Sequence, residues 1–489
     1  MKTNPGDVGA RLAGAVWIPP VVLAAAMVGW QAARPQLWRD EFATWSAATR
    51  SPSALDRLTE HIDGVLEPYY RFLHVWIGIF GDSVVALRWP SMLAAAATAG
   101  LVGVLGAVVG TPRAGLLAGL VYAVLPSTIR YGQEARPYAL AELAAVAATL
   151  LLFLALRRRR WYLWAGYAVT LALLGTLHLV MLLVLAGHLV AVLDDVRTTR
   201  SWRSLLPPGA AVLGAVAVLV PLMLRGYTQT GAQLGSSHRT SLYLLAELPV
   251  GVCYGVVAAA ALLVAAVAGA LLNGRTGRVF GLMTLAPIAA LAVLALFVPV
   301  FNHRYVIFVA PLACVLAGLG VARLRLPAGR EGMLYGLGAL LLLLLITLPE
   351  QDTARRSHEE FSAPLIDYRG AARVIAVGRQ PGDAIVYQRG GWQFADIAME
   401  YYLRRNAPAD VLAATTRIAA GGFWTPEEPA PDAALARVDR VWAVLPDGSA
   451  SGPGPRFDRV RAALARSFRE AGRWRLSGIT VLLFLRGRA

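Results

Sequence analysis

Eleven apolar stretches, each about long enough to cross a lipid bilayer, constrain this chain more than any other feature of its sequence. They are Leu12–Trp30, Ser91–Val109, Gly115–Ile129, Tyr138–Leu156, Tyr162–Leu177, His178–Leu193, Gly209–Leu224, Val250–Leu272, Phe280–Val300, Tyr305–Ala322 and Met333–Pro349. Hydrophobic residues fill 57% of the 489 positions and charged residues only 16%, whereas soluble domains are about 45–50% apolar. A single water-soluble enzyme is therefore excluded, and the sequence predicts a polytopic α-helical membrane protein.

Two of these assignments rest on further reasoning. The stretch from Tyr162 to Leu193 is too long for one span, so we divide it by a short turn near Thr176–His178. The first stretch follows Arg11 and resembles a signal peptide, but its apolar part is long for one. We therefore interpret it as a membrane anchor.

The basic residues predict how the chain is oriented. With the N-terminus inside, fifteen basic residues fall in the inner connections, and the run Arg157–Arg160 after a span is the strongest single marker. The short outer connections hold five, which are Arg130, Arg136, Arg225, Arg239 and Arg304. Most of the formal charge of +16 thus marks topology and contact with anionic lipid headgroups, and we expect no nucleic-acid partner. Lys2 is the only lysine, which we interpret as codon bias in a GC-rich bacterium.

This orientation in the plasma membrane leaves two soluble pieces outside the cytoplasm. The first is the loop 31–90 within a transmembrane module 1–349, and the second is the tail 350–489. Helices and strands alternate in the tail, which predicts a small extracytoplasmic α/β domain. The predicted helices are Tyr368–Gly378, Phe394–Arg405 and Phe457–Ala471, and the predicted strands are Ala384–Tyr387, Arg440–Leu445 and Ile479–Leu485.

The first loop carries two short amphipathic segments, Leu55–Ile62 and Pro68–Phe80. Their length and aromatic content predict helices that lie in the membrane interface and do not span it. Such helices form either a roof that guides a long prenyl chain or a simple membrane anchor.

Ionisable residues are scarce inside the predicted spans, where we find only Glu142, His178 and His188. Ion-coupled transporters usually need buried charges along a path, so this scarcity counts against transport. Polar residues collect instead at the outer ends of helices, in three places. These three places are the candidate functional sites.

The first place is a pair of adjacent carboxylates, Asp40 and Glu41, just after the first span. A solvated loop or a helix N-cap explains the pair without any function. The functional interpretation is a general base at the mouth of a membrane cavity. Because adjacent residues on a helix point about 100° apart, only one of the two is expected to face a substrate.

The second place is the outer connection 130–138, which is dense in polar groups. Its residues include Arg130, Tyr131, Gln133, Glu134, Arg136 and Tyr138. An interfacial anchor of tyrosine and arginine is one interpretation. The other is a polar wall that binds a phosphate and sugar hydroxyls.

The third place is the short connection that holds Asn302, His303, Arg304 and Tyr305 between two spans. An arginine held there by helices on both sides is well placed to bind a phosphate. Snorkelling to the headgroups is the alternative.

Histidine and cysteine give no metal site. His61, His74, His178 and His238 lie on or near the outer side without a spacing that defines a ligand set, and Cys253 and Cys314 lie in apolar stretches. The sequence also lacks a GxGxxG or Walker loop. We therefore assign no metal and no cofactor.

Taken together, these motifs resemble the GT-C glycosyltransferases. The resemblance covers about residues 12–349 and is closest to bacterial mannosyltransferase-like members, related to protein O-mannosyltransferases and to the aminoarabinose and galacturonic acid transferases of lipid A. It rests on the Asp40–Glu41 pair, the interfacial helices, the Tyr-Gly-Gln-Glu-Ala-Arg-Pro-Tyr run from Tyr131 to Tyr138, and His-Arg-Tyr at 303–305. Arg88 in Leu-Arg-Trp-Pro-Ser matches the family's Arg-x-Pro-Ser pattern.

The resemblance implies inverting transfer of a monosaccharide from a polyprenyl-phosphate donor to an extracytoplasmic glycan, glycolipid or protein. The family's usual base carries over to Asp40, while Glu41 orients a loop residue or a sugar hydroxyl. Arg304, Arg136 or His303 would stabilise the departing prenyl phosphate, with Tyr305 beside them. Tyr131, Gln133, Glu134 and Tyr138 are assigned to the donor pocket, and Arg88 to substrate binding, only by their positions in the matching motifs. Some relatives use a divalent metal, which the sequence does not settle.

Two other classes of protein also fit the spans and the tail. A flippase or transporter of lipid-linked glycans with an outer sensing domain explains both, but not the carboxylates and arginines at the outer helix ends. An oligosaccharide polymerase or ligase would use diphosphate donors instead.

Overall fold

A computed structural model describes residues 15–229, 239–323, 330–359, 365–389, 391–447 and 455–487. Contacts divide the chain into two compact units. The helical unit comprises Met1–Arg34, Gly64–Tyr69 and Val85–Arg356, and the mixed unit comprises Pro35–Asp63, Tyr70–Val84 and Ser357–Ala489. Most of the first loop therefore groups with the tail, which the sequence did not indicate.

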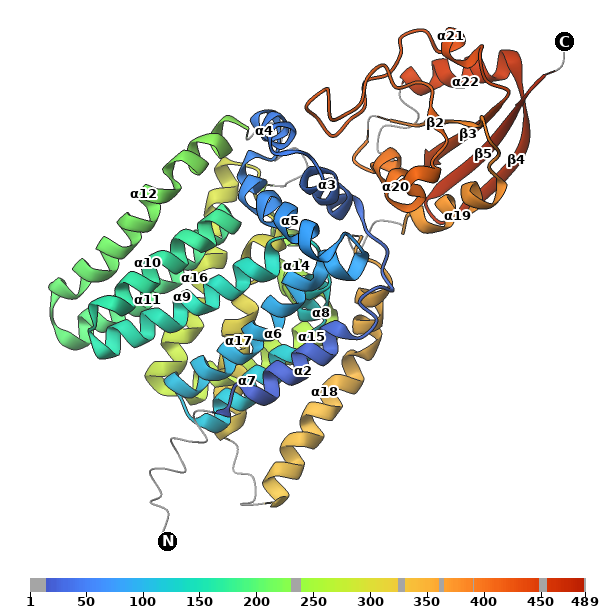
Figure 1. Ribbon diagram of the computed structural model, residues 1–489. Coiled ribbons are helices and arrows are strands. Elements are labelled where there is room, and N and C mark those ends of the chain that lie inside the picture. Colours follow the sequence, from blue (N-terminus) through green and yellow to red (C-terminus); the bar gives the residue numbers. More distant parts are fainter. Residues whose placement is uncertain are drawn as a thin grey trace. The chain divides into compact units, whose positions relative to one another are not determined.

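The helical unit is a bundle of mostly apolar helices (Figure 1). They are α2 (Ile18–Gly29), α6 (Val84–Val109), α7 (Pro112–Val124), α8 (Pro126–Gly132), α9 (Tyr138–Arg158), α10 (Trp161–Leu177), α11 (Val184–Thr199), α12 (Leu206–Thr228), α14 (Leu242–Cys253), α15 (Val256–Leu272), α16 (Gly274–Phe297), α17 (Val309–Arg323) and α18 (Arg330–Arg356). Short 3₁₀ turns join them: η1 (Gly64–Leu66), η2 (Leu179–Leu183), η3 (Trp202–Leu205) and η4 (His303–Val306).

Several of these helices can cross a membrane. Within the described residues, five are long and apolar enough, namely α6, α9, α11 with η2, α12 with η3, and α16. Two bent pairs, α7 with α8 and α14 with α15, raise the number to seven. The predicted class of polytopic helical membrane protein is thus confirmed, while the count of eleven spans stays a prediction. The predicted turn near Thr176–His178 is also confirmed, because α10 ends at Leu177.

Two of the predicted spans are bent. The stretch Gly115–Ile129 bends by 62° between α7 and α8, where Pro126 lacks the N–H that would continue the helix. The stretch Val250–Leu272 bends by 95° between α14 and α15, where Tyr254 has a left-handed φ of 56°. Both breaks bring polar backbone groups into an otherwise apolar bundle.

The second break is stabilised from another helix. Glu350 of α18 accepts hydrogen bonds from the backbone N–H groups of Val257 and Ala258, at 2.7 and 3.1 Å. These two N–H groups lie in the first turn of α15, where backbone donors have no acceptor within their own helix. A carboxylate at this end is also favoured by the helix dipole.

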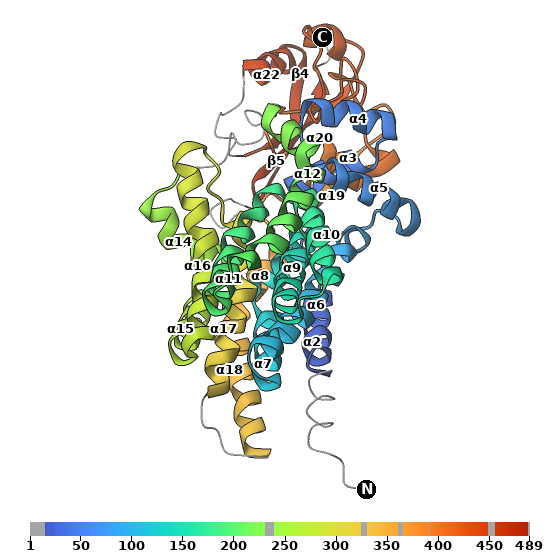
Figure 2. The same cartoon turned by 90° about the vertical axis from the view of Figure 1, so that its left-hand side faces the viewer.

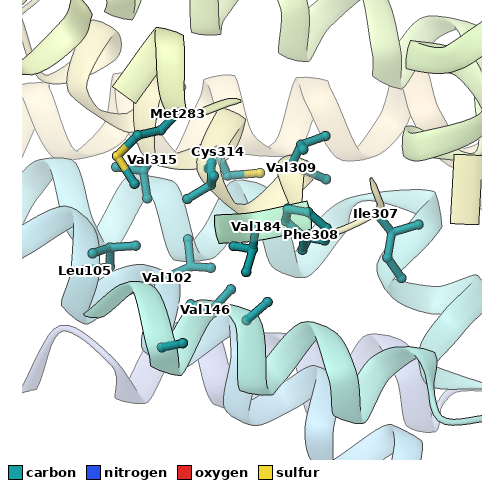
Figure 3. Packing of buried hydrophobic residues seen from close by; sticks show 14 of the residues in the cluster. Val102, Leu105, Val146, Val184, Met283, Ile307, Phe308, Val309, Cys314 and Val315 are labelled. Carbon is teal, nitrogen blue, oxygen red and sulfur yellow. The ribbon is translucent and has the colours of Figure 1, made fainter. Parts of the chain in front are cut away.

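The core of the helical unit is apolar and tightly packed. Side chains such as Val102 of α6, Val146 of α9 and Val315 of α17 lie in one shared core (Figure 3). Helices α15, α16 and α17 pack side by side (Figure 2). Gly269 permits this approach, because a Cβ there would collide with the carbonyl group of Leu316.

The mixed unit combines first-loop helices with the α/β tail. Its loop helices are α3 (Arg39–Ala48), α4 (Pro52–His61) and most of α5 (Glu67–Phe80). The tail contains α19 (Tyr368–Gly378), β1 (Ala384–Tyr387), α20 (Ala395–Leu403), η5 (Arg404–Asn406), β2 (Ala409–Asp410), α21 (Pro431–Leu435), β3 (Arg440–Pro446), α22 (Pro455–Ser467), β4 (Phe468–Leu476) and β5 (Ile479–Arg486). The two predicted loop helices are confirmed as helices.

The five strands form one mixed sheet in the order β2-β1-β3-β5-β4. Strand β1 runs parallel to β2 and β3, whereas β5 runs antiparallel to β3 and β4. Apolar residues of α22 pack with alternate residues of β1 and β3 in one core cluster. The tail is therefore the predicted α/β domain, with two strands that were not predicted. The predicted helix Phe457–Ala471 is too long, because β4 begins at Phe468.

Candidate active site

The outer connection after α8 forms a buried ion pair. Pro126 begins α8, and Arg130 lies in its last turn. Glu134 follows just beyond the end of the helix, and its Oε2 lies 2.7 Å from Nη1 of the arginine. Both side chains are at most 2% exposed. The Arg130 guanidinium also lies 5.6 Å from the ring centres of Tyr131 and Tyr254. Its positive charge is thus surrounded by one carboxylate and two aromatic faces.

The short turn η4 brings a second arginine into the same unit. The side chain of Asn302 accepts a hydrogen bond from the backbone N–H of Arg304 at 3.0 Å, which fixes the turn. Arg304 is 7% exposed. Burial, with Arg304 and Arg130 nearby, lowers the pKa of His303 to about 3. His303 is therefore neutral at physiological pH, and the positive charge of this region resides on the arginines.

A glycine allows His303 to lie where it does. A Cβ at Gly251 of α14 would be 2.7 Å from Cγ of the imidazole, so a larger residue would displace the ring. Helix α14 ends at Cys253, and the next residue, Tyr254, places its ring against the Arg130 guanidinium.

A series of neighbouring aromatic rings joins the outer connection 130–138 to the turn η4. Tyr131 lies 5.7 Å from Tyr138, Tyr138 lies 5.6 Å from His178, and His178 lies 5.1 Å from Tyr305, measured between ring centroids. Arg136 lies 6.0 Å from the ring centre of Tyr138. We call the whole set the basic-aromatic cluster: Arg130, Tyr131, Glu134, Arg136, Tyr138, His178, Tyr254, His303, Arg304 and Tyr305.

The cluster unites residues from two of the three predicted places. It adds Tyr254 and His178, which the sequence did not assign to substrate binding. Three arginines and one carboxylate give it a net positive charge. Arranged around aromatic faces, such a site suits an anionic group that carries an apolar chain.

Two predicted substrate-binding residues make structural contacts in the helical unit. Gln133 donates hydrogen bonds from Nε2 to the carbonyl oxygens of Val28 and Trp30, at 2.8 and 2.9 Å. Arg88 donates from Nη1 to the carbonyl oxygen of Ala32 at 2.9 Å. Both side chains are fully buried, and these bonds secure the chain at the end of α2.

The carboxylate pair belongs to the mixed unit, at the start of α3. Glu41 is completely buried, and its Oε2 lies 3.4 Å from the backbone N of Trp38 and 3.6 Å from Nδ1 of His358. Asp40 is different, because its side chain is 26% exposed, and its Oδ1 lies 3.8 Å from Nε of Arg39. The two carboxylates thus have different surroundings, as expected for adjacent helical residues.

Aromatic residues of the tail hold α3. The ring of Phe42 lies 5.1 Å from that of Tyr368, and Trp45 lies 5.2 Å from Tyr401, both edge to face. The backbone N–H of Leu37 donates to the Tyr402 hydroxyl at 3.1 Å. The tail is therefore part of the scaffold that positions Asp40.

The histidines considered as metal ligands have other contacts. Nδ1 of His61 and of His74 each lie 2.8 Å from a backbone carbonyl oxygen, those of Arg57 and Ala48. His178 belongs to the basic-aromatic cluster, and His238 lies outside the described residues. Across the described ranges, no group of three or more His, Cys, Asp or Glu is arranged to hold a metal ion.

Comparison with known proteins finds a family model that matches part of the chain and solved structures of similar fold. Residues 69–224 match the family model of dolichyl-phosphate-mannose-protein mannosyltransferases. That segment contains Arg88 and the connection 130–138, but neither Asp40 nor η4. No curated protein sequence matches the chain.

Solved structures match over nearly the whole length. The apo structure of ArnT from Cupriavidus metallidurans aligns with a TM-score of 0.58 at 14% identity, covering 99% of this chain and 98% of that one. The structure of ArnT from the same organism bound to undecaprenyl phosphate aligns with a TM-score of 0.53 at 14% identity, covering 97% of each chain. The chain is thus a polytopic membrane protein with the fold of the GT-C glycosyltransferases.

Proposed function

We propose that this protein transfers a monosaccharide from a polyprenyl-phosphate donor to an acceptor outside the cytoplasm, with inversion at the anomeric carbon. One observation carries the proposal. Two short connections that are far apart in sequence meet in the helical unit and bring together the buried Arg130 and Arg304, the half-buried Arg136 and several tyrosines. The likeness to an ArnT structure that contains undecaprenyl phosphate supports the same class of ligand.

The basic-aromatic cluster binds the phosphate of the donor. A prenyl-phosphate sugar carries one negative charge on its phosphodiester, and transfer of the sugar leaves a phosphate monoester with more charge. Arg304 and Arg136 can stabilise that increase through charge-assisted hydrogen bonds, which are about twice as strong as neutral ones. His303 is neutral and contributes as a hydrogen-bonding group.

Asp40 activates the acceptor. Its carboxylate takes the proton from the acceptor hydroxyl while the oxygen attacks the anomeric carbon. The bond from that carbon to the phosphate oxygen breaks, and its electron pair stays on the departing prenyl phosphate. General-base help of this kind is worth about 10²–10⁴-fold in rate. Since one displacement occurs, the anomeric configuration inverts.

Glu41 serves the same reaction indirectly. Its buried contacts with Trp38 and His358 support it as a residue that positions α3. The tail, which packs on the same helix, helps to position the acceptor. The transfer reaction needs no nucleotide or other cofactor, because the donor already carries prenyl phosphate as its leaving group.

The distribution of basic residues supports an orientation in the plasma membrane with the tail and Asp40 outside the cytoplasm. The acceptor is then a glycan, glycolipid or protein of the cell envelope.

The purified protein in lipid nanodiscs tests the proposal. It would be incubated with radiolabelled prenyl-phosphate sugars, the matching prenyl-diphosphate sugars and cell-envelope acceptors, with Asp40→Asn as the inactive control. Release of free prenyl phosphate together with a labelled acceptor supports the proposal. Consumption of the diphosphate donors alone would instead identify a polymerase or ligase. Movement of a fluorescent donor across proteoliposomes without transfer would identify a flippase.

A further inference from the structure

A second cluster of charged and aromatic side chains lies in the tail, at one edge of its sheet. Strands β1, β2 and β3 are parallel, so their carboxyl ends share that edge. Strands β2 and β3 lie on opposite sides of β1, so the order of the strands reverses at β1. In open sheets of this kind, ligands bind outside the carboxyl ends of the strands, where the order reverses.

One buried arginine lies at this edge among three carboxylates. Arg389 follows β1, and its side chain is only 8% exposed. Its guanidinium pairs with Asp410, the last residue of β2, with Glu427 at 3.2 Å and with Asp396 at 3.6 Å. Its buried Nε has no hydrogen-bond acceptor among the described residues.

The charges of this group do not balance. One arginine faces three carboxylates, which leaves an excess of two negative charges when all are ionised. Burial raises the pKa of Asp410, against the opposing charge of Arg389. The group is therefore rich in hydrogen-bond acceptors and repels anions. Within the described residues it is not arranged to hold a metal ion.

An exposed aromatic surface adjoins the carboxylates. Trp392 is 46% exposed, and its ring lies 4.9 Å from that of Trp424, nearly perpendicular to it. Next to Trp424, the hydroxyl of Thr425 donates to Oδ2 of Asp396 at 3.0 Å. The segments that carry the tryptophans thus also carry the carboxylates. An exposed indole held by other rings is a rigid surface for a flat apolar face.

We propose that this edge of the tail binds a neutral saccharide. The ring hydroxyls donate hydrogen bonds to Asp396, Asp410 and Glu427, and the C–H face of the sugar packs on Trp392. A sugar that carries a carboxylate or phosphate is repelled by the excess negative charge. This inference rests on the proposed function, since the saccharide would be part of the acceptor glycan.

The test is a binding measurement on the full-length protein in nanodiscs. The probes are a galacturonan hexasaccharide and the neutral galactan hexasaccharide made by reducing its carboxylates, which differ only in that group, together with mannan and glucan hexasaccharides. At least one neutral probe should bind, and the acidic probe should bind more weakly than its neutral match. Binding of none of the neutral probes, or tighter binding of galacturonan than galactan, would overturn the inference.

Substitutions of single tryptophans test whether the saccharide binds at this edge of the sheet. Trp392→Ala should weaken binding about tenfold, which corresponds to about 1.4 kcal/mol, because it removes the aromatic surface on which the sugar packs. Trp392→Phe should recover part of the loss. The matched control is Trp474→Ala, which removes a partly exposed tryptophan of the edge strand β4 and should leave binding unchanged. Equal affinity of Trp392→Ala and wild type would contradict the site.

Failure of this inference can be separated from failure of the proposed function. The same preparations would be assayed for transfer from a short prenyl-phosphate sugar to a simple alkyl glycoside. Transfer without saccharide binding would contradict the tail site alone. Saccharide binding that depends on Trp392, without transfer from any donor, would support the site and contradict the proposed enzyme.

Discussion

The carboxylate of Glu41 lies 3.6 Å from Nδ1 of His358, and both side chains are fully buried. Asp40, the next residue along α3, has a side chain that is 26% exposed. One carboxylate of the pair is therefore enclosed by its own unit, and the other is accessible. This difference supports Asp40 as the base and Glu41 as a positioning residue.

We expect Asp40→Asn to fold like wild type and to lose about 10²–10⁴-fold in turnover, because an amide cannot accept the proton of the acceptor. Glu41→Gln should instead lower the unfolding free energy by about 1–3 kcal/mol through its buried contacts. Thermal unfolding and initial transfer rates of both variants check this. If Asp40→Asn turns over at the wild-type rate, the assignment of the base is wrong.

Arg304→Ala should weaken donor binding by about ten- to a hundredfold, because a hydrogen bond to a charged group is worth roughly 1.5–3 kcal/mol. Arg304→Lys should recover part of this loss, since it keeps the charge but not the planar two-pronged contact. A titration with a prenyl-phosphate sugar gives the affinities. Arg113→Ala, which removes an exposed arginine at the start of α7, is the matched control. Wild-type affinity in Arg304→Ala would move the phosphate contact to Arg136.

Arg130 should behave differently, because it is paired with Glu134 inside the protein. Arg130→Met leaves that carboxylate buried without its partner, which typically costs about 3–5 kcal/mol. The double variant Arg130→Met/Glu134→Leu should recover most of the stability, and neither variant should bind the donor as wild type does. Unfolding in detergent measures the stability. A single variant as stable as wild type would show that the buried pair does not hold this connection.

The sequence predicted most elements whose pattern is local. Helix Tyr368–Gly378 and strand Ala384–Tyr387 appear with the predicted bounds, because their apolar residues follow the periods of a helix and of a buried strand. Strand β4 was missed because it is an edge strand with mostly exposed residues, so it lacks the apolar alternation. Its first residues were read as the end of the preceding helix.

The candidate site was only partly predictable. The motifs led to Arg136 and Arg304, whose residue types and positions at helix ends are visible in the sequence. Tyr254 joins them only because α14 and α15 break in the middle of an apolar stretch. The glycine at position 255, just after Tyr254, is the feature of the sequence that indicates this break. Nothing local indicated that Gln133 and Arg88 bind backbone carbonyls near α2, since those contacts depend on tertiary packing.

The predicted orientation is checked by labelling single cysteines. Ser467→Cys lies at the exposed end of α22, and Arg197→Cys lies in a connection predicted to be cytoplasmic. In intact spheroplasts, an impermeant maleimide should label the first and not the second, and lysis should expose both. Cys253 and Cys314 are buried and should contribute little background. The opposite labelling pattern would place the tail and Asp40 in the cytoplasm and contradict the proposed acceptor.

The last prediction concerns Asp82, which connects the first loop to the tail within the mixed unit. Its Oδ2 accepts hydrogen bonds from Nε1 of Trp45 at 2.8 Å and from Nη1 of Arg404 at 2.6 Å. Burial opposes ionisation of Asp82, but the bonds from Arg404 and Trp45 outweigh it, so the pKa lies below its usual value. A carboxyl whose pKa is lower in the folded state stabilises that state above its unfolded pKa, near 3.9.

We therefore expect the contribution of Asp82 to be complete at neutral pH and to disappear as the pH falls through its folded pKa. Asp82→Asn should increase hydrogen exchange in α3 at pH 7, and the difference from wild type should shrink below about pH 4. Asp458→Asn, a change at an exposed carboxylate of α22, should leave exchange in α3 unchanged at both pH values. If Asp82→Asn matches wild type at pH 7, these hydrogen bonds do not hold α3 to the tail, and Asp40 must be positioned by the other contacts of this helix, such as the rings of Phe42 and Trp45 and the carboxylate of Glu41.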